Sequence, residues 1–448
     1  MDVRSFLAAA EARGWLRRVD VTVDPHLELA RVVHALGEEP ALFSSVKGWD
    51  GPVVAGLCSR RRHFCLALGI AEEELLPALL AALRAPTKPA VVEAAPCQEV
   101  VVEGGDVDLG HLPIVTHFEG DGGPYVTAGV AVIHDPDLGR NLSYHRLMRV
   151  GRRCFTARLV EGRGAHRAWG KVSGDLPMAV CIGAPLAVQL AASMSPAPGV
   201  DEMAIANALQ PVATVRAVGS DLAVPAETEI VLEGRLTHHL GDEGPFVDLT
   251  QTRDFVRQQP FFVVDRITHR RAPIYQALLP GGDEHRLLMG MPREPTIYDA
   301  VSGVCVCRDV VITPGGGHWL HAVVRIDKRA PDDGRAAIEA AFQGHTSLKH
   351  VVVVDADVDA ADPRAVEWAI ATRFQADRDL VVLHDQPSSS LDPSARHVPG
   401  EKARTSKMGL DATIPWDTPD GPSRPEDYRV VAYGAVDLAR YLGGEGAS

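Results

Sequence analysis

The hydrophobic pattern of the chain changes character twice, and this change constrains the fold more than any other feature. Up to about residue 90, helical segments such as 27–36 and 72–83 alternate with short strand-like runs, which is typical of a small α/β domain. From about residue 97 to residue 298, short β-branched runs separated by turn residues dominate and favour a β-barrel or sandwich. After residue 299, strands alternate with helices again, which indicates a second α/β domain with a mostly parallel sheet.

The length of the chain also requires more than one domain. Its 448 residues exceed the roughly 250–300 residues at which a single hydrophobic core stops growing. We therefore expect an N-terminal α/β domain at 1–96, a central domain at 97–298 and a C-terminal α/β domain at 299–448. The predicted class is a multidomain α+β fold with a central split β-barrel.

Charge and composition exclude several classes of protein. The formal net charge is -14 and no long block of Lys and Arg is present, so a nucleic-acid partner is not expected. No segment has 18 uninterrupted apolar residues and the N-terminus has no signal-peptide profile, so we expect no membrane partner and a cytoplasmic location. The seven cysteines lack the paired spacing of a zinc site and are expected to be reduced, buried thiols.

The densest polar cluster runs from Asn141 to Arg146, with the sequence NLSYHR, directly after a turn at 135–139. A strand bounded by such a turn can present both Asn141 and Arg146 to a pocket. The alternative is the end of a surface strand whose polar residues are solvated. The residues alone leave both interpretations open.

Two further residues suggest a metal site. His166 lies 25 residues after Asn141, and Glu233 lies inside an apolar strand, where a lone carboxylate is costly to bury unless it is paired. An amide oxygen, an imidazole nitrogen and a carboxylate oxygen suit manganese or magnesium better than structural zinc. Single His and Glu residues far apart in sequence are, however, usually structural.

Glu284 and Lys407 are candidates for an acid and a phosphate ligand. Glu284 follows a Gly-Gly turn and adjoins Asp283 and His285; neighbouring carboxylates repel, which raises the pKa of one of them and suits a general acid. An exposed loop has the same composition. Lys407 stands in a small-residue loop that is a plausible phosphate seat. The signatures of a Walker loop, a serine hydrolase elbow and an HExxH zinc protease are absent from the sequence.

Five segments, in order along the chain, resemble the UbiD family of prenylated-FMN-dependent (de)carboxylases. They are DGGPYVTAGVAVIHDPDLGRNLSYHR at 121–146, AASMSPAPGVDEMAIANAL at 191–209, IVLEGRL followed by EGPF at 243–246, LPGGDEHRLLMG, and SKMGLDAT. The resemblance implies a flavin-reductase-like split barrel in the central domain. It also implies prenylated FMN whose phosphate is tied to the protein through Mn²⁺ or Mg²⁺ held by Asn141, His166 and Glu233.

The resemblance implies further roles around the cofactor. Arg146 stands beside the flavin and Glu284 is the proton donor. Cofactor contacts are expected from the rest of the segment, Tyr144 and His145, from the turn at Ser193 and Met194, and from Lys407, with K⁺ nearby. One departure is present. Relatives place a second carboxylate in a Glu-Arg-Glu network, yet the positions five residues before and after Glu284 are Leu279 and Met289.

The expected function is therefore a reversible, non-oxidative decarboxylase of an α,β-unsaturated or (hetero)aromatic carboxylic acid. Loss of carbon dioxide from such a carbon needs an electron sink, which a cofactor supplies. The resemblance implies a flavin prenyltransferase as supplier of the cofactor, and a homodimer or higher homo-oligomer assembled through the C-terminal domain. The alternatives are a non-catalytic flavin-binding protein, favoured by the missing second carboxylate, and a flavin reductase.

Overall fold

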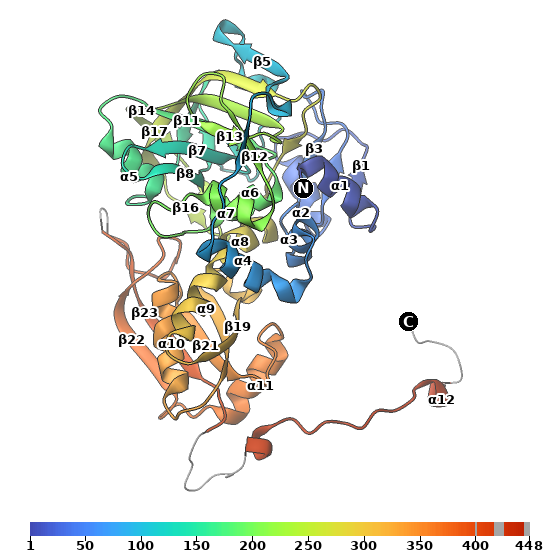
Figure 1. Cartoon of the computed structure of the whole chain (residues 1–448), viewed down its shortest axis with the longest axis vertical. Coiled ribbons are helices and arrows are strands. Elements are labelled where there is room, and N and C mark those ends of the chain that lie inside the picture. Colours follow the sequence, from blue (N-terminus) through green and yellow to red (C-terminus); the bar gives the residue numbers. More distant parts are fainter. Residues whose placement is uncertain (399–400, 416–424, 443–448) are drawn as a thin grey trace.

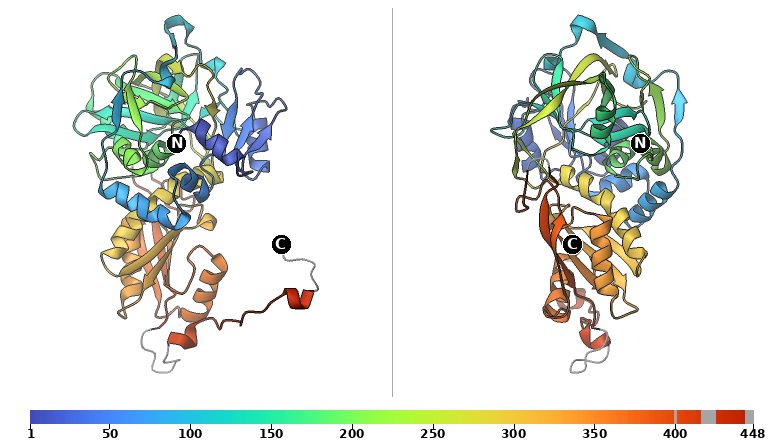
Figure 2. Two further views of the ribbon diagram at one scale, coloured as in Figure 1. Left: turned by 45° about the vertical axis from the view of Figure 1, so that its right-hand side comes forward. Right: turned by 90° about the vertical axis from the view of Figure 1, so that its left-hand side faces the viewer.

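The computed structural model describes residues 1–398, 401–415 and 425–442. The N-terminal and central segments lie in the upper part of the molecule, and the C-terminal domain lies below them (Figure 1). Two rotated views show the same arrangement, and in the left one the last described residues run away from the body (Figure 2). No helix among the described residues is long and apolar enough to cross a membrane.

The N-terminal region forms a four-stranded sheet with the order β1-β2-β3-β18. Its first helix buries Val3, Phe6, Leu7 and Ala10, a spacing that places apolar side chains on one helix face. The last strand, β18, belongs to a much later part of the chain and pairs in parallel with β3. The elements are α1 (Val3–Glu11), β1 (Arg17–Val19), α2 (Glu28–Ala35), β2 (Ala41–Phe43), β3 (Val53–Ala55), α3 (Arg61–Leu68), α4 (Leu75–Arg84) and β18 (Tyr275–Gln276).

The central region is built on a nine-stranded antiparallel sheet with the path β6-β9-β10-β17-β14-β11-β7-β8, and β5 pairs with β17. Alternate residues of β7 enter two different cores, Val130 and Val132 on one face and Ala131 and Ile133 on the other. The path ends at β6 and β8 and does not close. The multidomain α+β class is confirmed, but the predicted split barrel of the flavin-reductase type is not.

The strands of the central sheet are β5 (Val100–Glu103), β6 (Tyr125–Val126), β7 (Val130–Asp135), β8 (Gly139–Tyr144), β9 (Leu147–Arg149), β10 (Cys154–Ala157), β11 (Leu176–Ile182), β14 (Ile230–Glu243) and β17 (Arg257–His269). Two small sheets accompany it, β13-β12-β4 and β15-β16, formed by β4 (Ala90–Val92), β12 (Ala213–Arg216), β13 (Ala223–Pro225), β15 (Phe246–Val247) and β16 (Arg253–Asp254). The helices are α5 (Gly164–Lys171), α6 (Leu186–Ser193) and α7 (Glu202–Leu209). All eight residues of α6 are buried, so its lack of a polar face reflects a core helix.

The C-terminal region contains a five-stranded sheet with the order β19-β20-β21-β23-β22. Its three inner strands are mutually parallel and both edge strands are antiparallel, so the sheet is mixed rather than mostly parallel. Helices α9 and α10 pack on one face, and α11 packs against the other. The elements are α9 (Glu294–Ser302), β19 (Val306–Ile312), β20 (His321–Asp327), α10 (Asp333–Gly344), β21 (His350–Asp355), α11 (Pro363–Arg373), β22 (Leu380–Pro387), β23 (Arg404–Asp411) and α12 (Ala439–Leu442).

The segment that joins the two halves of the molecule carries residues of the candidate site. Helix α8 (Asp283–Gly290) and the single 3₁₀ turn η5 (Met291–Arg293) precede α9, and α8 and α9 lie at the waist of the molecule (Figure 1). An ion pair between Arg61 and the buried Glu294 joins this waist to the N-terminal region, and Glu294 also accepts a hydrogen bond of 2.9 Å from the backbone of Ile312.

Candidate active site

Arg146 is the centre of a group of charged side chains that are largely buried. It follows β8, and only 9% of its side chain is exposed. Nε and Nη2 donate to the two carboxylate oxygens of Glu243 at 2.8 and 2.9 Å, Nη1 donates to Asp248 at 2.6 Å, and Nη2 also donates to Asp254 at 2.8 Å. Burial acts to lower the pKa of Arg146, but the carboxylates outweigh burial and raise it. The guanidinium is therefore permanently charged and held in one orientation.

Glu243 and Asp248 supply the carboxylate pair that the sequence did not reveal around Glu284. They stand five residues apart, at the end of β14 and after β15, and both bind Arg146. The hydroxyl of Tyr125 donates to Glu243 at 3.2 Å, and the ring of Phe246 lies 4.6 Å from the Arg146 guanidinium. Glu243 is the first residue of the EGPF motif, and Asp248 stands five residues after it. A carboxylate at this spacing was the signal in the sequence that could have identified the pair.

Glu284 lies apart from this network. Its oxygens accept hydrogen bonds from the backbone of Gly56 at 2.9 Å and of Cys58 at 3.0 Å, and burial raises its pKa to about 7. Among the described residues, no hydrogen bond or ion pair joins Glu284 to Arg146. Its neighbour His285 is influenced electrostatically by Asp248 and Arg146, and burial lowers the pKa of that imidazole. The role of Glu284 as proton donor stays a prediction.

Asn141 and Glu202 form the group best suited to a metal ion. The amide nitrogen of Asn141 donates to Glu202 at 3.1 Å, while its Oδ1 is buried without a hydrogen-bond partner. Burial raises the pKa of Glu202 to about 7, and the second Glu202 oxygen accepts from the backbone of Leu142 at 2.9 Å. An unpartnered amide oxygen beside a buried acid is a donor set that fits a hard divalent cation.

His166 is on α5, the helix that begins beside Asn141. A Cβ added to Gly164, in the first turn of that helix, would lie 3.2 Å from both terminal atoms of the Asn141 amide, so the helix begins against Asn141. The ring nitrogen Nδ1 of His166 accepts from the backbone of Gly162 at 3.4 Å. No three His, Cys, Asp or Glu side chains of the described chain are grouped as a metal site, so a site here depends on the Asn141 oxygen.

The structure does not bring Glu233 next to this group, and its role as a metal ligand stays a prediction. Across the sheet, Glu233 pairs with Ala179, Ala179 with Val132, and Val132 with Leu142. Asn141 is the residue next to Leu142 on β8, so its side chain is on the other face of the sheet. Glu233 therefore lies three strands away, about 14 Å, and points to the opposite face. Its carboxylate accepts from the backbone of Val218 at 3.0 Å and of Gly219 at 2.6 Å. These amides, with Arg266 at 3.8 Å, satisfy the buried acid without a metal.

The remaining predicted cofactor contacts are placed as follows. The hydroxyl of Tyr144 donates to Gln189 at 3.4 Å. The ring nitrogens of His145 lie 2.9 Å from the Ser143 hydroxyl and from the Arg158 carbonyl, and burial lowers its pKa to about 4. At the end of α6, the Ser193 hydroxyl donates to the Leu190 carbonyl at 2.7 Å, and Met194 is buried. No hydrogen bond or ion pair between these residues and Arg146 is found in the described chain.

Lys407 belongs to a group of cations in the C-terminal domain. Its ammonium donates to the Thr346 carbonyl at 2.8 Å and lies 5.1 Å from the Phe342 ring, and burial lowers its pKa to about 8. Nearby, Nε of Arg293 and Nε2 of His345 are buried without hydrogen-bond partners. His345 is influenced by the charges of Arg293, Lys407 and Arg163.

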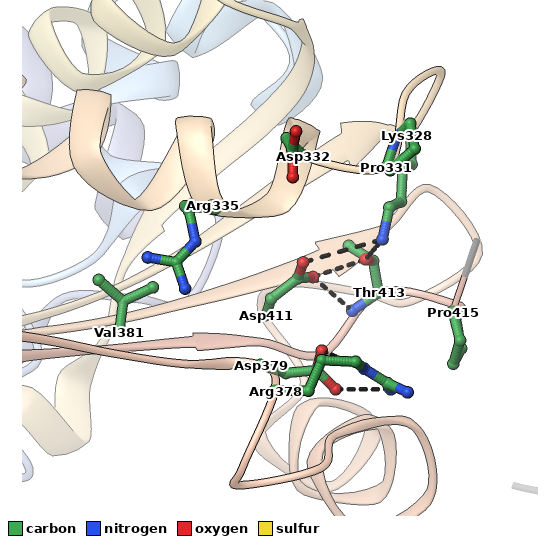
Figure 3. A pocket seen from close by; sticks show the side chains of 10 residues that line it. All are labelled: Lys328, Pro331, Asp332, Arg335, Arg378, Asp379, Val381, Asp411, Thr413 and Pro415. Carbon is green, nitrogen blue, oxygen red and sulfur yellow. Dashed lines mark hydrogen bonds and ion pairs between the residues drawn. The ribbon is translucent and has the colours of Figure 1, made fainter. Parts of the chain in front are cut away.

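A separate cavity of about 240 Å³ lies at the other end of the C-terminal sheet (Figure 3). Lys328 donates to Thr413 at 2.8 Å and lies 3.8 Å from Asp411, and Arg378 pairs with Asp379 at 2.8 Å. Its cations are thus largely neutralised by its own carboxylates. This cavity is at the start of α10 and the end of β23, away from the residues described above.

Three models of the 3-octaprenyl-4-hydroxybenzoate carboxy-lyase (UbiD) family match the chain: the N-terminal domain over residues 7–83, the Rift-related domain over 90–283 and the C-terminal domain over 286–412. Anhydromevalonate phosphate decarboxylase of Methanothermobacter thermautotrophicus is 40% identical over 405 residues, covering 89% of this chain and 93% of that protein. The enzyme of the same name from Methanosarcina mazei is 40% identical over 418 residues, covering 92% and 96%.

Solved structures give the same result. The UbiD-class enzyme HmfF from Pelotomaculum thermopropionicum in complex with FMN has a TM-score of 0.92 and 37% identity, covering 99% of this chain and 100% of that one. An evolved dimeric form of HmfF in complex with prenylated FMN has a TM-score of 0.88 and 36% identity, covering 98% and 100%. The chain therefore belongs to the UbiD family and is a UbiD-class decarboxylase.

Proposed function

We propose that this protein decarboxylates anhydromevalonate phosphate, an unsaturated carboxylic acid that carries a phosphate ester, with prenylated FMN as cofactor. The names of the relatives that align along nearly the whole chain support this substrate, and the FMN and prenylated-FMN complexes of HmfF support the cofactor. The observation that carries the proposal is the sharing of Arg146 by Glu243 and Asp248. When bound, the prenylated flavin supplies the electron sink for the charge that carbon dioxide leaves behind.

Asn141, Glu202 and His166 would hold Mn²⁺ or Mg²⁺, which would neutralise the cofactor phosphate. The unpartnered oxygen of Asn141 and the buried acid of Glu202 support this set. Lys407 would contact the same phosphate as a point charge, and the turn at Ser193 and Met194 would lie along it. The potassium ion expected from the family is assigned no ligands.

Arg146 orients the substrate carboxylate, and Asp248 donates the proton. Four of the five N–H groups of Arg146 are used by the three carboxylates, and one on Nη1 remains for the substrate. When carbon dioxide leaves, the electron pair of the broken C–C bond stays on the ring carbon or alkene carbon. The proton of Asp248 then forms the new C–H bond at that carbon. Glu243, fixed by Tyr125 and Arg146, keeps the guanidinium in place. Glu284 is the competing donor.

A non-catalytic flavin-binding protein is the weaker proposal, because it rested on the absence of a second carboxylate and Glu243 with Asp248 supply the pair. A flavin reductase loses its support in the same way, since it rested on a barrel and the central sheet is open. Aromatic acids remain the alternative substrates. A cytoplasmic location and a flavin prenyltransferase as cofactor supplier stay predictions.

A homodimer is the proposed assembly, and the C-terminal tail is its support. Residues 429–442 run away from the body (Figure 1), and Val431, Tyr433, Leu438 and Tyr441 on this segment are all more than half exposed. Exposed apolar side chains in such a row mark an interaction surface. Val382 and Met408, paired across β22 and β23, expose a further apolar patch on the C-terminal sheet.

The experiment is turnover by protein produced together with a flavin prenyltransferase. Carbon dioxide release is measured from anhydromevalonate phosphate and from a panel of aromatic acids, and the visible spectrum records how much flavin is bound. We expect release from the phosphorylated unsaturated acid at the highest kcat/KM. Flavin-loaded protein that releases no carbon dioxide from any of these acids contradicts the proposed function.

A further inference from the structure

The cluster of Arg163, Arg293 and Lys407, with the His345 imidazole among them, lacks a neutralising carboxylate among the described residues. Other shielded arginines of the chain have one: Arg146 pairs with Glu243, Arg61 with Glu294, and Arg373 with Asp357. Arg293 makes no ion pair and no side-chain hydrogen bond with any described residue, and its buried Nε has no partner. Arg293 is only partly exposed, and a charge that is partly withdrawn from water without a counter-ion is costly, so binding of an anion is favoured there.

Aromatic packing fixes the cluster in position. The Arg293 guanidinium lies 5.5 Å from the centre of the Trp319 ring, and the His345 ring meets the same indole edge-on at 4.4 Å. Trp319 is itself anchored by a hydrogen bond of 3.0 Å to Ser389. Arg293 and His345 are therefore presented together from η5 and from the end of α10.

Arg163 reaches the cluster from the central region. It is the residue before α5, it is exposed, and its side chain makes no hydrogen bond or ion pair with described residues. Burial lowers the pKa of Arg293 to about 10, and the charge of Arg163 contributes to that shift. The charge of Arg163 therefore acts on Arg293 from another part of the fold, and both charges would attract an anion bound near Arg293.

One phosphate does not account for all of this charge. At the proposed cofactor site, a divalent ion and Lys407 together exceed the charge of Glu202 by about two units, which the dianion of one phosphate monoester neutralises. Arg163 and Arg293 remain. Their charge matches a second phosphate of the same kind, and the proposed substrate contains one.

The spacing between the reactive end and the cluster fits such a substrate. His285, at the start of α8, is influenced by Arg146 and Asp248, and Arg293 follows eight residues later, an advance of about 12 Å along helical backbone. In anhydromevalonate phosphate, six bonds separate the carboxyl carbon from phosphorus, a span of about 7–8 Å when extended. The side chains of Arg146 and Arg293 would have to extend toward the substrate to span the remaining distance.

We propose that Arg293 and His345, faced by Arg163, bind the phosphate of the substrate and select phosphorylated over unphosphorylated unsaturated acids. The proposal rests on the proposed function and deepens it. Arg293 supplies a bidentate fork for two phosphate oxygens, and Nε2 of His345 supplies a third donor when it carries the proton. The reacting carbon is thereby held at a fixed distance from Asp248.

The test compares two substrates in flavin-loaded enzyme: anhydromevalonate phosphate and anhydromevalonate. In Arg293→Gln, the ratio of kcat/KM for the phosphorylated over the unphosphorylated acid should fall about 10- to 100-fold, which corresponds to loss of a hydrogen-bonded charge. Arg293→Lys keeps the charge but not the two parallel donors of the guanidinium, so its ratio of kcat/KM should lie between those of wild type and Arg293→Gln. The matched control Arg335→Gln removes an exposed arginine at the far end of α10 and should leave the ratio unchanged.

Two results overturn the proposal. An unchanged ratio in Arg293→Gln assigns the phosphate elsewhere, and loss of bound flavin, read from the visible spectrum, assigns Arg293 to the cofactor phosphate. If wild-type enzyme decarboxylates neither acid, the proposed reaction is wrong, and the phosphate-binding site is then tested by equilibrium binding of the phosphorylated acid. Weaker binding to Arg293→Gln than to wild type then supports a phosphate-binding site at Arg293, and equal binding refutes it.

Discussion

Replacing Glu202 by glutamine should abolish divalent-metal binding while making the metal-free protein more stable at alkaline pH. Burial raises the pKa of Glu202 from 4.5 to about 7 in the folded chain. The folded protein therefore holds this proton more tightly than the unfolded chain, and the free energy of unfolding falls as pH rises from about 4.5 to about 7. A shift of about 2.5 pKa units corresponds to about 3 kcal/mol at higher pH.

Glutamine removes this ionisation cost. At pH 8 and without metal, Glu202→Gln should exceed the wild type in free energy of unfolding by up to about 3 kcal/mol, less the strength lost in the hydrogen bond from Leu142. At pH 4 the two proteins should be equally stable in this respect. Metal affinity has the opposite dependence, because only the ionised carboxylate binds: in wild type it should fall about tenfold per pH unit below pH 7, and in the variant it should be lost.

The assay combines metal content by elemental mass spectrometry with urea unfolding at pH 4 and pH 8. Glu233→Gln is the matched control, since it changes a second buried glutamate. It should keep the metal but lose about 1–3 kcal/mol, because the Val218 and Gly219 amides lose their charged acceptor. A Glu202→Gln protein that binds Mn²⁺ like the wild type, beside a Glu233→Gln protein that does not, refutes the assignment.

Three further changes test the site and the assembly. Asp248→Asn should keep flavin and metal but lower steady-state carbon dioxide release by about 10²–10⁴; wild-type turnover in this variant assigns the proton donor elsewhere. Glu284→Gln should keep most of the turnover, because Glu284 bonds to the backbone of Gly56 and Cys58 and not to Arg146; a loss of turnover as large as that of Asp248→Asn makes Glu284 the donor instead. Deletion of residues 429–448 should reduce the molar mass in light scattering to that of a smaller species, and an unchanged mass shows that the tail is not an interface.

The fold was predictable where local pattern determines structure. Period-two alternation identifies β7, because its alternate residues enter two cores, and the spacing of buried residues identifies α1. Closure of the central sheet was not predictable, because it depends on whether β6 and β8 pair, and neither strand carries a signal for that. The pairing of β18 with β3 joins two-residue and three-residue strands from distant parts of the chain, which are too short to show a period.

The candidate site illustrates the same limit at the level of single residues. Glu233 was chosen because a carboxylate in an apolar strand needs a partner, and this reasoning is correct. The partner, however, is a pair of loop amides and Arg266, which only the tertiary structure reveals. Glu202 gave no such signal, because an acid in the first turn of a helix is common for electrostatic reasons. Its link to Asn141 arises where α7 packs against the edge strand β8.

The two ends of the proposed substrate pocket differ in net charge, and this difference assigns orientation of the carboxylate to the end at Arg146 and binding energy to the end at Arg293. Arg146 and Arg257 face Glu243, Asp248 and Asp254, so when Asp248 holds the proton that it donates, the charges at the reactive end cancel. A substrate carboxylate therefore gains orientation there but little net attraction, and a tightly bound carboxylate would be harder to lose as neutral carbon dioxide. Binding energy has to come from a part of the substrate that does not react, and the unneutralised cations near Arg293 are placed to provide it through the phosphate.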